Sequence, residues 1–395
     1  MKLLIVSPYY FPIPAWGARA RCYYLLKMLA RKHTISLLTI DDRAEIEAYY
    51  NTNQVEDLTD RIELLPRPEH HHKRLRQLMN VISRRSNVLD DHSVPGMQEA
   101  LDALLARNDY DAVLFESALT ASYHIPEDVK VILNQHNIEF ELLERTYLHE
   151  KAGLRKWYNW WESRLLRSVE LERCQKADVV LVTSERERLL LKSMLQRSVI
   201  EVVPNGVDIE TFDRNCSERE VPSRIIFTGS MDYHPNIDGA LFFAQKCWPR
   251  IRARIPDATW QIVGKNPPPE IRKLGELPGV TVTGSVPDVR PYFNQAMVAI
   301  APLMIGSGTR LKILEALAMQ KAVVSTSLGC EGISVVSGKH LIVVDQPDAF
   351  AQAVVELIKS SETRKALETA GRALVETEYS WERCGDQLLH VLEQI

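Results

Sequence analysis

Cysteine pairs, long apolar runs and a strong net charge are all absent from this sequence of 395 residues. Its six cysteines are scattered without a Cys-x-x-Cys pair, which argues against a local zinc site or a disulfide framework and fits a reducing cytosol. No apolar run reaches the roughly 18 residues that a membrane-spanning helix needs. A formal net charge of −4 gives no overall preference for nucleic acid. We therefore expect a cytoplasmic protein that does not bind nucleic acid.

Short apolar runs alternate with helical stretches along the whole chain, which is typical of parallel α/β domains. The chain is long enough for two such domains, each with its own core. In the first half we predict strands at 3–7, 35–39, 112–115, 131–134 and 179–183. In the second half we predict strands at 224–228, 260–264, 280–283, 298–301, 322–325 and 341–344.

The turn sequence Pro204-Asn205-Gly206 separates the two halves. We predict one Rossmann-like domain at 1–205, a second at 206–378, and a closing apolar-periodic helix at 379–395. Gly206 is either a hinge or part of a plain turn, and both interpretations stay open. In doubly wound sheets ligands bind beyond the carboxyl ends of the strands, so we expect the active site in the cleft between the halves.

The most informative segment is the glycine-rich turn G-S-G-T-R-L-K-I-L-E at 306–315. Gly306 and Gly308 let the backbone approach a ligand closely, and the unpaired amides of a helix start favour phosphate. Arg310 and Lys312 add positive charge, while Glu315 is suited to accept hydrogen bonds from sugar hydroxyls. Diphosphate beside ribose describes a nucleotide-sugar. An ordinary loop with a solvated helix face is the alternative on these residues alone.

Further segments, in their order and spacing, resemble the retaining GT-B glycosyltransferases of family four, also called glycosyl transferases group 1. They are L-L-I-V-S-P-Y-Y-F-P-I-P-A-W-G-A from residue 3, I-L-N-Q-H-N-I-E-F from 132, V-V-P-N-G-V-D from 202, I-I-F-T-G-S-M-D-Y-H-P-N from 225 and G-S-V-P-D-V from 284. The resemblance implies two Rossmann-like domains facing across a cleft. It also implies that residues 1–205 bind the acceptor, that residues 206–378 bind the nucleotide-sugar, and that the C-terminal helix packs against the first domain.

The resemblance also implies roles for single residues. His136 matches a histidine near the donor's anomeric carbon, where it would hydrogen-bond a sugar hydroxyl and help stabilise developing charge. Arg310 and Lys312 would be the other catalytic residues. The implied donor contacts are Gly17, Gly229, Ser307, Gly308, Thr309 and Glu315. On the residues alone, scaffolding is the more common role of a histidine after a strand, and the alternative role for Gly17 is to start a helix at 18–29.

Two positions depart from the family's pattern. Ser307 stands where many members have the first of two acids, so a contact to the sugar ring is missing or is made by Ser307 and backbone. Ser230 and Asn236 stand where many members have a cationic pair after the first strand of the second domain. We expect Arg310 and Lys312 to supply that charge from another loop.

The resemblance implies transfer with retention, in which the leaving phosphate takes the acceptor's proton and no metal is needed. We expect no cofactor, a UDP- or GDP-sugar as donor, and a lipid-linked, envelope or exopolysaccharide glycan as acceptor. Asp109-Tyr110-Asp111 mimics a metal-binding motif but, just before a strand, is predicted to be a turn and cap. The rivals are a nucleotide-sugar epimerase of the same architecture and a non-catalytic donor-binding subunit.

Two regions suggest peripheral contact with the inner face of the cytoplasmic membrane. Between Arg67 and Arg85 six basic residues outnumber one acid, a local charge of +5. A helix predicted at 154–176 has an apolar face that we assign to the core: Leu154, Trp157, Tyr158, Trp161, Leu165 and Val169. Trp160 lies outside that face among Lys156, Arg164 and Arg167, which is typical of a bilayer interface or of surface cation–π packing.

Overall fold

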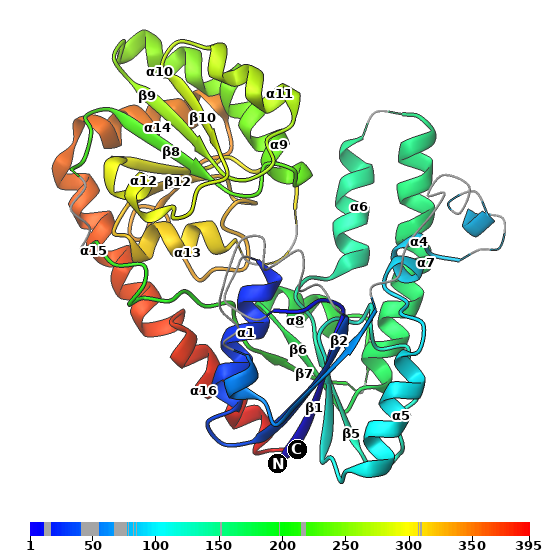
Figure 1. The fold of residues 1–395 in the computed structure, drawn as a ribbon. Helices are drawn as coiled ribbons and strands as arrows, with labels where there is room; N and C mark the ends of the chain where they lie inside the picture. Colours follow the sequence, from blue (N-terminus) through cyan, green and yellow to red (C-terminus); the bar gives the residue numbers. More distant parts are fainter. Residues whose placement is uncertain are drawn as a thin grey trace. The chain divides into compact units, whose positions relative to one another are not determined.

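The computed structural model describes residues 1–11, 17–40, 55–66, 77, 79–81, 83, 85–150, 152–196, 198–214, 219–306, 308 and 310–395. These residues form two compact units (Figure 1). The first unit combines Met1–Pro204 with Cys384–Ile395, and the second is Asn205–Arg383. The chain passes from the first to the second unit between Pro204 and Asn205, within the turn sequence.

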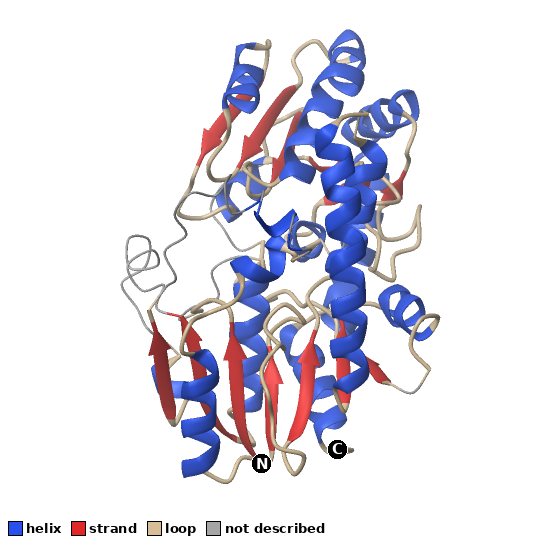
Figure 2. Ribbon diagram, turned by 90° about the vertical axis from the view of Figure 1, so that its right-hand side faces the viewer, coloured by secondary structure: helices blue, strands red, loops and turns tan. Residues whose placement is uncertain are grey.

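The first unit is built on a parallel sheet with the strand order β3-β2-β1-β4-β5-β6-β7. Its strands are β1 (Lys2–Ser7), β2 (Thr34–Ile40), β3 (Arg61–Leu65), β4 (Ala112–Phe115), β5 (Lys130–Asn134), β6 (Val179–Val182) and β7 (Val199–Val202). Its helices are α1 (Ala18–Leu29), α4 (Asn87–Asp91), α5 (Met97–Arg107), α6 (Glu139–His149), α7 (Leu154–Lys176) and α8 (Glu185–Lys192), with a 3-10 turn at Glu56–Leu58. Helices flank the strands (Figure 2), so the central strands are continuous apolar runs.

The second unit repeats the plan with the strand order β10-β9-β8-β11-β12-β13. Its strands are β8 (Arg224–Thr228), β9 (Thr259–Val263), β10 (Val280–Gly284), β11 (Val298–Ala301), β12 (Ala322–Ser325) and β13 (Ile342–Val343). Its helices are α9 (His234–Phe242), α10 (Trp248–Arg254), α11 (Pro269–Arg272), α12 (Arg290–Gln295), α13 (Leu311–Ala318), α14 (Pro347–Lys359) and α15 (Ser361–Glu378). The core packs Phe243 edge-on against Trp260, with 4.7 Å between ring centroids.

The predicted α/β fold is confirmed, and every predicted strand is present. The prediction missed β3 and β7, the edge strands of the first sheet. Both are short and only half-buried, and they carry charges such as Arg61, Glu63 and Glu201. An edge strand that faces solvent lacks the continuous apolar run by which the buried strands were found.

The last helix, α16 (Trp381–Leu392), contributes its residues from Cys384 onward to the first unit. Leu388 and Leu392 are buried, and Lys32 Nζ of the first unit lies 3.1 Å from Glu393 Oε1. Gly385 lets the helix approach α1, because a Cβ there would overlap Met28. Five residues of the segment that we predicted as the closing helix, Tyr379–Arg383, belong to the second unit.

Gly206 has a packing role. A Cβ at this position would lie 2.8 Å from the Trp381 indole, closer than side chains tolerate. The main chain of Val207 also pairs with this segment, since its amide donates to the Tyr379 carbonyl over 2.7 Å. Glycine is therefore required here for close approach of the indole.

Both sheets reverse their strand order at one point, between β1 and β4 in the first unit and between β8 and β11 in the second. At such a point the chain segments that follow the two strands diverge, and they leave room for a ligand at the carboxyl edge of the sheet. The residues that follow β1, β4 and β5, and those that follow β8 and β11, are therefore the first candidates for a site.

Candidate functional site

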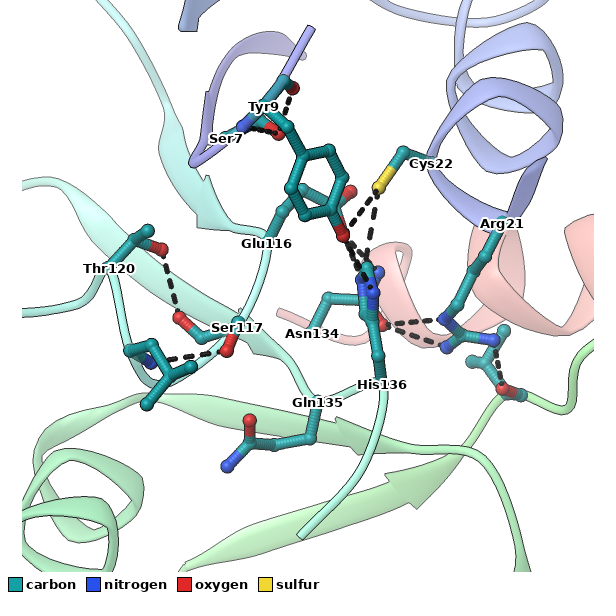
Figure 3. Close-up of polar contacts among 12 residues, drawn as sticks. Ser7, Tyr9, Arg21, Cys22, Glu116, Ser117, Thr120, Asn134, Gln135 and His136 are labelled. Carbon is teal, nitrogen blue, oxygen red and sulfur yellow. Dashed lines mark hydrogen bonds and ion pairs between the residues drawn. The ribbon is translucent and has the colours of Figure 1, made fainter. Parts of the chain in front are cut away.

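In the first unit, three side chains that follow neighbouring strands meet at the carboxyl edge of the sheet (Figure 3). Tyr9 follows β1, Glu116 follows β4 directly, and His136 follows β5. Because β4 pairs with both β1 and β5, the three chain segments leave the sheet side by side. The sequence analysis identified only His136 among them.

His136 is held by both ring nitrogens. Its Nε2 lies 2.7 Å from Glu116 Oε2, and its Nδ1 lies 3.1 Å from the Tyr9 hydroxyl. A carboxylate only accepts, so the tautomer that fits carries its proton on Nε2 and accepts at Nδ1 from Tyr9. Burial, reinforced by Cys22 and Glu116, raises the pKa of Tyr9 well above its ordinary value, so this hydroxyl remains a donor. The ring is thereby fixed in orientation and tautomer.

A second layer of buried polar groups fixes Glu116. Asn134 Nδ2 donates to Glu116 Oε2 over 2.8 Å. The amide of Asn134 is oriented by Arg21, whose Nη2 donates to Asn134 Oδ1 over 2.8 Å. Arg21 is only 1% exposed, and its Nη1 donates to the Val203 carbonyl over 2.8 Å. The histidine therefore rests on a hydrogen-bonded chain of buried side chains, Glu116, Asn134 and Arg21.

The backbone immediately after Glu116 is strained. Ser117 has a φ of 114°, a region that residues with a side chain seldom occupy. The loop is held there because Thr120 Oγ1 donates to the Ser117 carbonyl over 2.9 Å and the Ala118 amide donates to Gln135 Oε1 over 3.0 Å. This conformation directs the Glu116 carboxylate toward His136 (Figure 3).

Gly17 stands at the N-cap of α1 with a φ of 56° and no side-chain cap. The helix at 18–29 that the sequence predicted is confirmed. A Cβ at Gly17 would meet no described atom within 4 Å, so its backbone conformation, rather than crowding by described residues, favours glycine. The phosphate contact of Gly17 stays a prediction.

In the second unit, the glycine turn and α13 lie at the point where the strand order reverses. Gly229 follows β8, and the turn that contains Gly306 and Gly308 follows β11. All three glycines have positive φ. A Cβ at Gly229 would lie 2.8 Å from Lys312 Nζ, so glycine leaves room for that ammonium group.

Lys312 contacts Asn236, one of the two positions where the resemblance led us to expect a cation. Its Nζ donates to Asn236 Oδ1 over 2.5 Å, and Asn236 Nδ2 donates to the Ser230 carbonyl over 2.8 Å. The same ammonium lies 4.3 Å from the centroid of the Phe227 ring. Burial first, and then Arg310, lowers the pKa of Lys312 to about 7, although Glu315 opposes the shift. This contact agrees with the expectation that α13 supplies the charge missing after β8, and that role stays a prediction.

Arg310 and Glu315 flank Lys312 along α13. Arg310, 9% exposed, is the N-cap residue and donates from Nη1 to the Gly308 carbonyl. Burial raises the pKa of Glu315 to about 7, although Lys312 opposes this shift. Among the described residues, none donates a hydrogen bond to its carboxylate, which leaves both oxygens available to a ligand.

The predicted site residues thus fall into two sets. Gly17 and His136 belong to the first unit, while Gly229, Gly308, Arg310, Lys312 and Glu315 belong to the second. Ser307 and Thr309 lie outside the described residues. The residues that the sequence analysis missed are Tyr9, Arg21, Cys22, Glu116 and Asn134. Tyr9, Glu116 and Asn134 share one signal, a polar residue at or just after the end of one of several adjacent strands, which becomes visible only when the strand order is known. Arg21 and Cys22 lie within α1 and do not share it.

Family models match both halves of the chain. Residues 17–211 match the model described as glycosyltransferase family 4, and residues 222–360 match the model described as glycosyl transferases group 1. The chain belongs to this glycosyltransferase family. It is therefore a glycosyltransferase, and the recognition made from its motifs is confirmed.

Two curated proteins resemble this glycosyltransferase. An uncharacterized 44.6 kDa protein from the cps region of Klebsiella pneumoniae is 24% identical over 68% of the chain and 71% of the relative. Phosphatidyl-myo-inositol mannosyltransferase of Mycolicibacterium smegmatis is 27% identical over 49% of the chain. That match spans 51% of the mannosyltransferase, about half of its length.

Solved structures share the fold over the full chain. Sucrose-phosphate synthase from Thermosynechococcus elongatus superimposes with a TM-score of 0.73 at 16% identity, over 100% of this chain and 99% of that one. The Anabaena protein Alr3699/HepE, solved in complex with UDP-glucose, gives a TM-score of 0.71 at 12% identity over 100% of both chains. At such identities the likeness shows the GT-B fold.

Helix α7 has the predicted ends, but the predicted core face is wrong. Leu154 and Trp157 are 88% and 49% exposed, and the buried face instead carries Glu162, Ser163, Leu166, Glu170 and Cys174. The two acids are buried because they accept hydrogen bonds. Glu162 accepts from the Val88 amide over 3.1 Å, and Glu170 from the Phe140 amide over 3.0 Å. The face of α7 that is buried is therefore set by hydrogen bonds from the first turns of α4 and α6, and not by the apolar pattern of the helix.

Proposed function

We propose that this glycosyltransferase transfers a sugar from a UDP- or GDP-sugar to a glycan acceptor, with retention and without a metal or cofactor. The observation that carries the proposal is the Lys312 ammonium, which lies 2.5 Å from Asn236 Oδ1 and beside Gly229. A desolvated cation beside a glycine of positive φ is suited to a diphosphate, whose charge would replace the hydration that burial removes. The solved structure that holds UDP-glucose in the same fold supports this donor class.

The two cations would act mainly on the leaving group. As the glycosidic bond breaks, negative charge grows on the β-phosphate, and Lys312 and Arg310 would stabilise it more than the ground state. Glu315, whose carboxylate has no hydrogen-bond donor among the described residues, would accept from the ribose hydroxyls. Gly17, Gly229, Ser307, Gly308 and Thr309 would let backbone and hydroxyl groups approach the donor.

His136 would act on the sugar. Its Nε2 proton is directed to Glu116, and its Nδ1, which accepts from the Tyr9 hydroxyl in the free protein, would exchange that hydrogen bond for one from a sugar hydroxyl. Glu116 is bound by His136 and Asn134 and only 2% exposed, so it is poorly placed to attack a sugar carbon. Retention would then follow a front-side route. The acceptor oxygen bonds to the anomeric carbon, the bond to the leaving oxygen breaks, and a β-phosphate oxygen takes the acceptor's proton.

Incubation of the protein with UDP- and GDP-sugars, with and without glycan acceptors, tests the proposal by chromatography of nucleotide and sugar products. Transfer predicts a glycosylated acceptor and stoichiometric nucleoside diphosphate, with the α or β configuration of the donor preserved by NMR. An epimerase would change the donor without an acceptor. A binding subunit would show a thermal shift with the donor and no product. Either of the last two results would overturn the proposal.

The acceptor side includes a feature that favours a membrane surface. At the ends of α6 and α7 that meet in one hairpin (Figure 1), the large apolar side chains are exposed: Leu148, Leu154, Trp157 and Trp160. Arg155 is 71% exposed beside them, and Arg164 lies 5.7 Å from the Trp160 ring. Aromatic side chains among cations suit the interface of an anionic leaflet. This observation supports the proposal of peripheral membrane contact, and with it we propose a lipid-linked acceptor and a cytoplasmic location.

Within the described residues, no helix is both long and apolar enough to span a membrane. Most of the basic stretch between Arg67 and Arg85 lies outside the described residues. The membrane proposal therefore rests on the α6–α7 hairpin alone.

A further inference from the structure

Cys22 brings a thiol into the cluster around His136. It lies in α1, is fully buried, and places its Sγ 3.8 Å from His136 Nε2 and 3.9 Å from the Tyr9 hydroxyl. Together with Glu116 it completes a set of one sulfur, one imidazole nitrogen and one carboxylate oxygen, all within 4.8 Å of one another. Transfer of a sugar as proposed above gives this thiol no task.

We propose that Cys22, Glu116 and His136 form a binding site for Zn²⁺, and that the bound ion reversibly inhibits glycosyl transfer. The binding of the ion is inferred from the positions and chemistry of these three side chains and does not depend on the proposed function. Inhibition rests on the function proposed for His136.

The three side chains match the ligand chemistry of zinc. Zn²⁺ prefers thiolate, imidazole and carboxylate in tetrahedral geometry, with bonds of about 2.3 Å to sulfur and about 2.0 Å to nitrogen or oxygen. Such bonds separate the ligand atoms by about 3.3 to 3.6 Å. The sulfur and nitrogen are 3.8 Å apart, near that value, and the nitrogen and oxygen at 2.7 Å need to separate by less than about 1 Å. Water would take the fourth position.

The surrounding groups already support such a site. His136 would bind the ion through Nε2 and donate its Nδ1 proton to the Tyr9 hydroxyl, which lies 3.1 Å away. Asn134 Nδ2 holds the carboxylate oxygen from the other side over 2.8 Å. Hydrogen bonds of this kind, which orient the imidazole and hold the carboxylate from outside, strengthen zinc sites.

Charge and protons balance. Without metal, burial raises the pKa of Cys22 well above its ordinary value, so the thiol is protonated. Zn²⁺ displaces that proton to solvent, and the imidazole proton shifts from Nε2 to Nδ1 with no further release. Thiolate and carboxylate then neutralise the dication, which suits a buried position. One proton is released for each ion bound.

The ion would inhibit by occupying His136 Nε2. Binding separates the ring from Glu116 and fixes the opposite tautomer, so Nδ1 carries the proton and can no longer accept a hydrogen bond from the sugar. Since all three ligands come from different elements, α1 and the segments after β4 and β5, the ion would also tie these elements together.

Co²⁺ titration of the reduced full-length protein tests binding without any need for activity, because a thiolate bound to Co²⁺ gives an intense near-ultraviolet charge-transfer band. We expect one equivalent of Co²⁺ to produce the band and Zn²⁺ to displace it. Cys22→Ser should abolish the band, and His136→Ala and Glu116→Gln should weaken binding at least about tenfold. Cys174→Ser is the matched control, since Cys174 is an equally buried thiol of the same unit, and it should retain the band.

In the activity arm, Zn²⁺ should inhibit transfer at the concentrations that displace Co²⁺, and a chelator should restore it. Each variant is measured against its own metal-free rate, and Cys22→Ser should be at least tenfold less sensitive. A wild type without the band, or a band that persists in folded Cys22→Ser, would overturn the site. A band at Cys22 without Zn²⁺ inhibition would refute only the inhibitory role. If no transferase activity is found at all, the binding arm still decides the site.

Discussion

At the residue scale, the chemistry of His136 depends on partner residues that no local sequence motif indicates. The histidine lies in a segment that resembles its family, whereas Glu116 follows an ordinary apolar strand. The two meet because β4 and β5 are neighbours in a parallel sheet, and parallel pairing is specified by the whole domain rather than by nearby residues. The sequence therefore predicted the histidine but not the carboxylate that orients it.

Glu116→Gln should lower kcat by at least about tenfold, or about 1.4 kcal/mol of transition-state stabilisation, while the KM for the donor changes little. The amide preserves size but removes the charge that holds the Nε2 proton of His136. Steady-state rates across pH 6 to 9 measure this, with the exposed Glu127→Gln as control. An unchanged kcat in folded Glu116→Gln would show that His136 needs no anionic partner.

Lys312 gives a prediction about pH. Its pKa is lowered to about 7, so at pH 8 the side chain is largely neutral in the free protein. A diphosphate favours the ammonium form and raises this pKa, so binding at pH 8 should take up a proton. Affinity for UDP should fall by up to about tenfold per pH unit above 7.

Calorimetry in two buffers of different ionisation enthalpy measures the proton uptake. Lys312→Arg is the matched variant, because arginine stays charged and should flatten the pH dependence. If the wild type and Lys312→Arg take up the same number of protons on binding UDP, the pH dependence does not arise from Lys312.

At the scale of elements, α7 shows where helix periodicity succeeds and where it fails. The helix ends were predicted, and they agree with the usual end signals, since Gly153 precedes the helix and basic residues occupy its last turn. The buried face was not predicted, because Glu162 and Glu170 are buried to accept hydrogen bonds from other elements. An apolar pattern cannot reveal a carboxylate whose partner is a backbone amide elsewhere in the chain.

The α6–α7 hairpin should bind anionic vesicles. Arg155→Glu with Lys156→Glu should weaken binding at least about thirtyfold, since each basic residue near such a surface contributes about 1 kcal/mol. Trp157→Ala should weaken it further at any salt concentration. Vesicle sedimentation at low and high salt measures both effects.

The matched control reverses two exposed lysines of the second unit, Lys359→Glu with Lys365→Glu, which change the net charge equally. If both pairs weaken binding to the same extent, the attraction is a property of net charge and the hairpin has no special role.

At the scale of the whole molecule, the two-unit plan was predictable because each unit restarts the same alternation of buried strands and helices. The closing helix was predictable in type but divides its residues between the units, with Trp381 in the second and Leu388 in the first. That division depends on which core each side chain enters, and an apolar period alone does not specify a core.

Leu388→Ala should therefore destabilise the first unit, although it lies near the end of the chain. The side chain is fully buried, and removing such a leucine costs about 2.7 to 5.0 kcal/mol, a large share of a typical stability of about 5 to 15 kcal/mol. Thermal unfolding should show a transition lowered by roughly 5 to 15 °C, whereas Leu189→Ala, at a position 58% exposed, should leave it nearly unchanged. Because the proposed UDP site lies in the second unit, UDP affinity below the transition should be retained. If Leu388→Ala instead abolishes UDP binding at low temperature while the first unit remains folded, the end of α16 supports the second unit's site rather than the first unit's core.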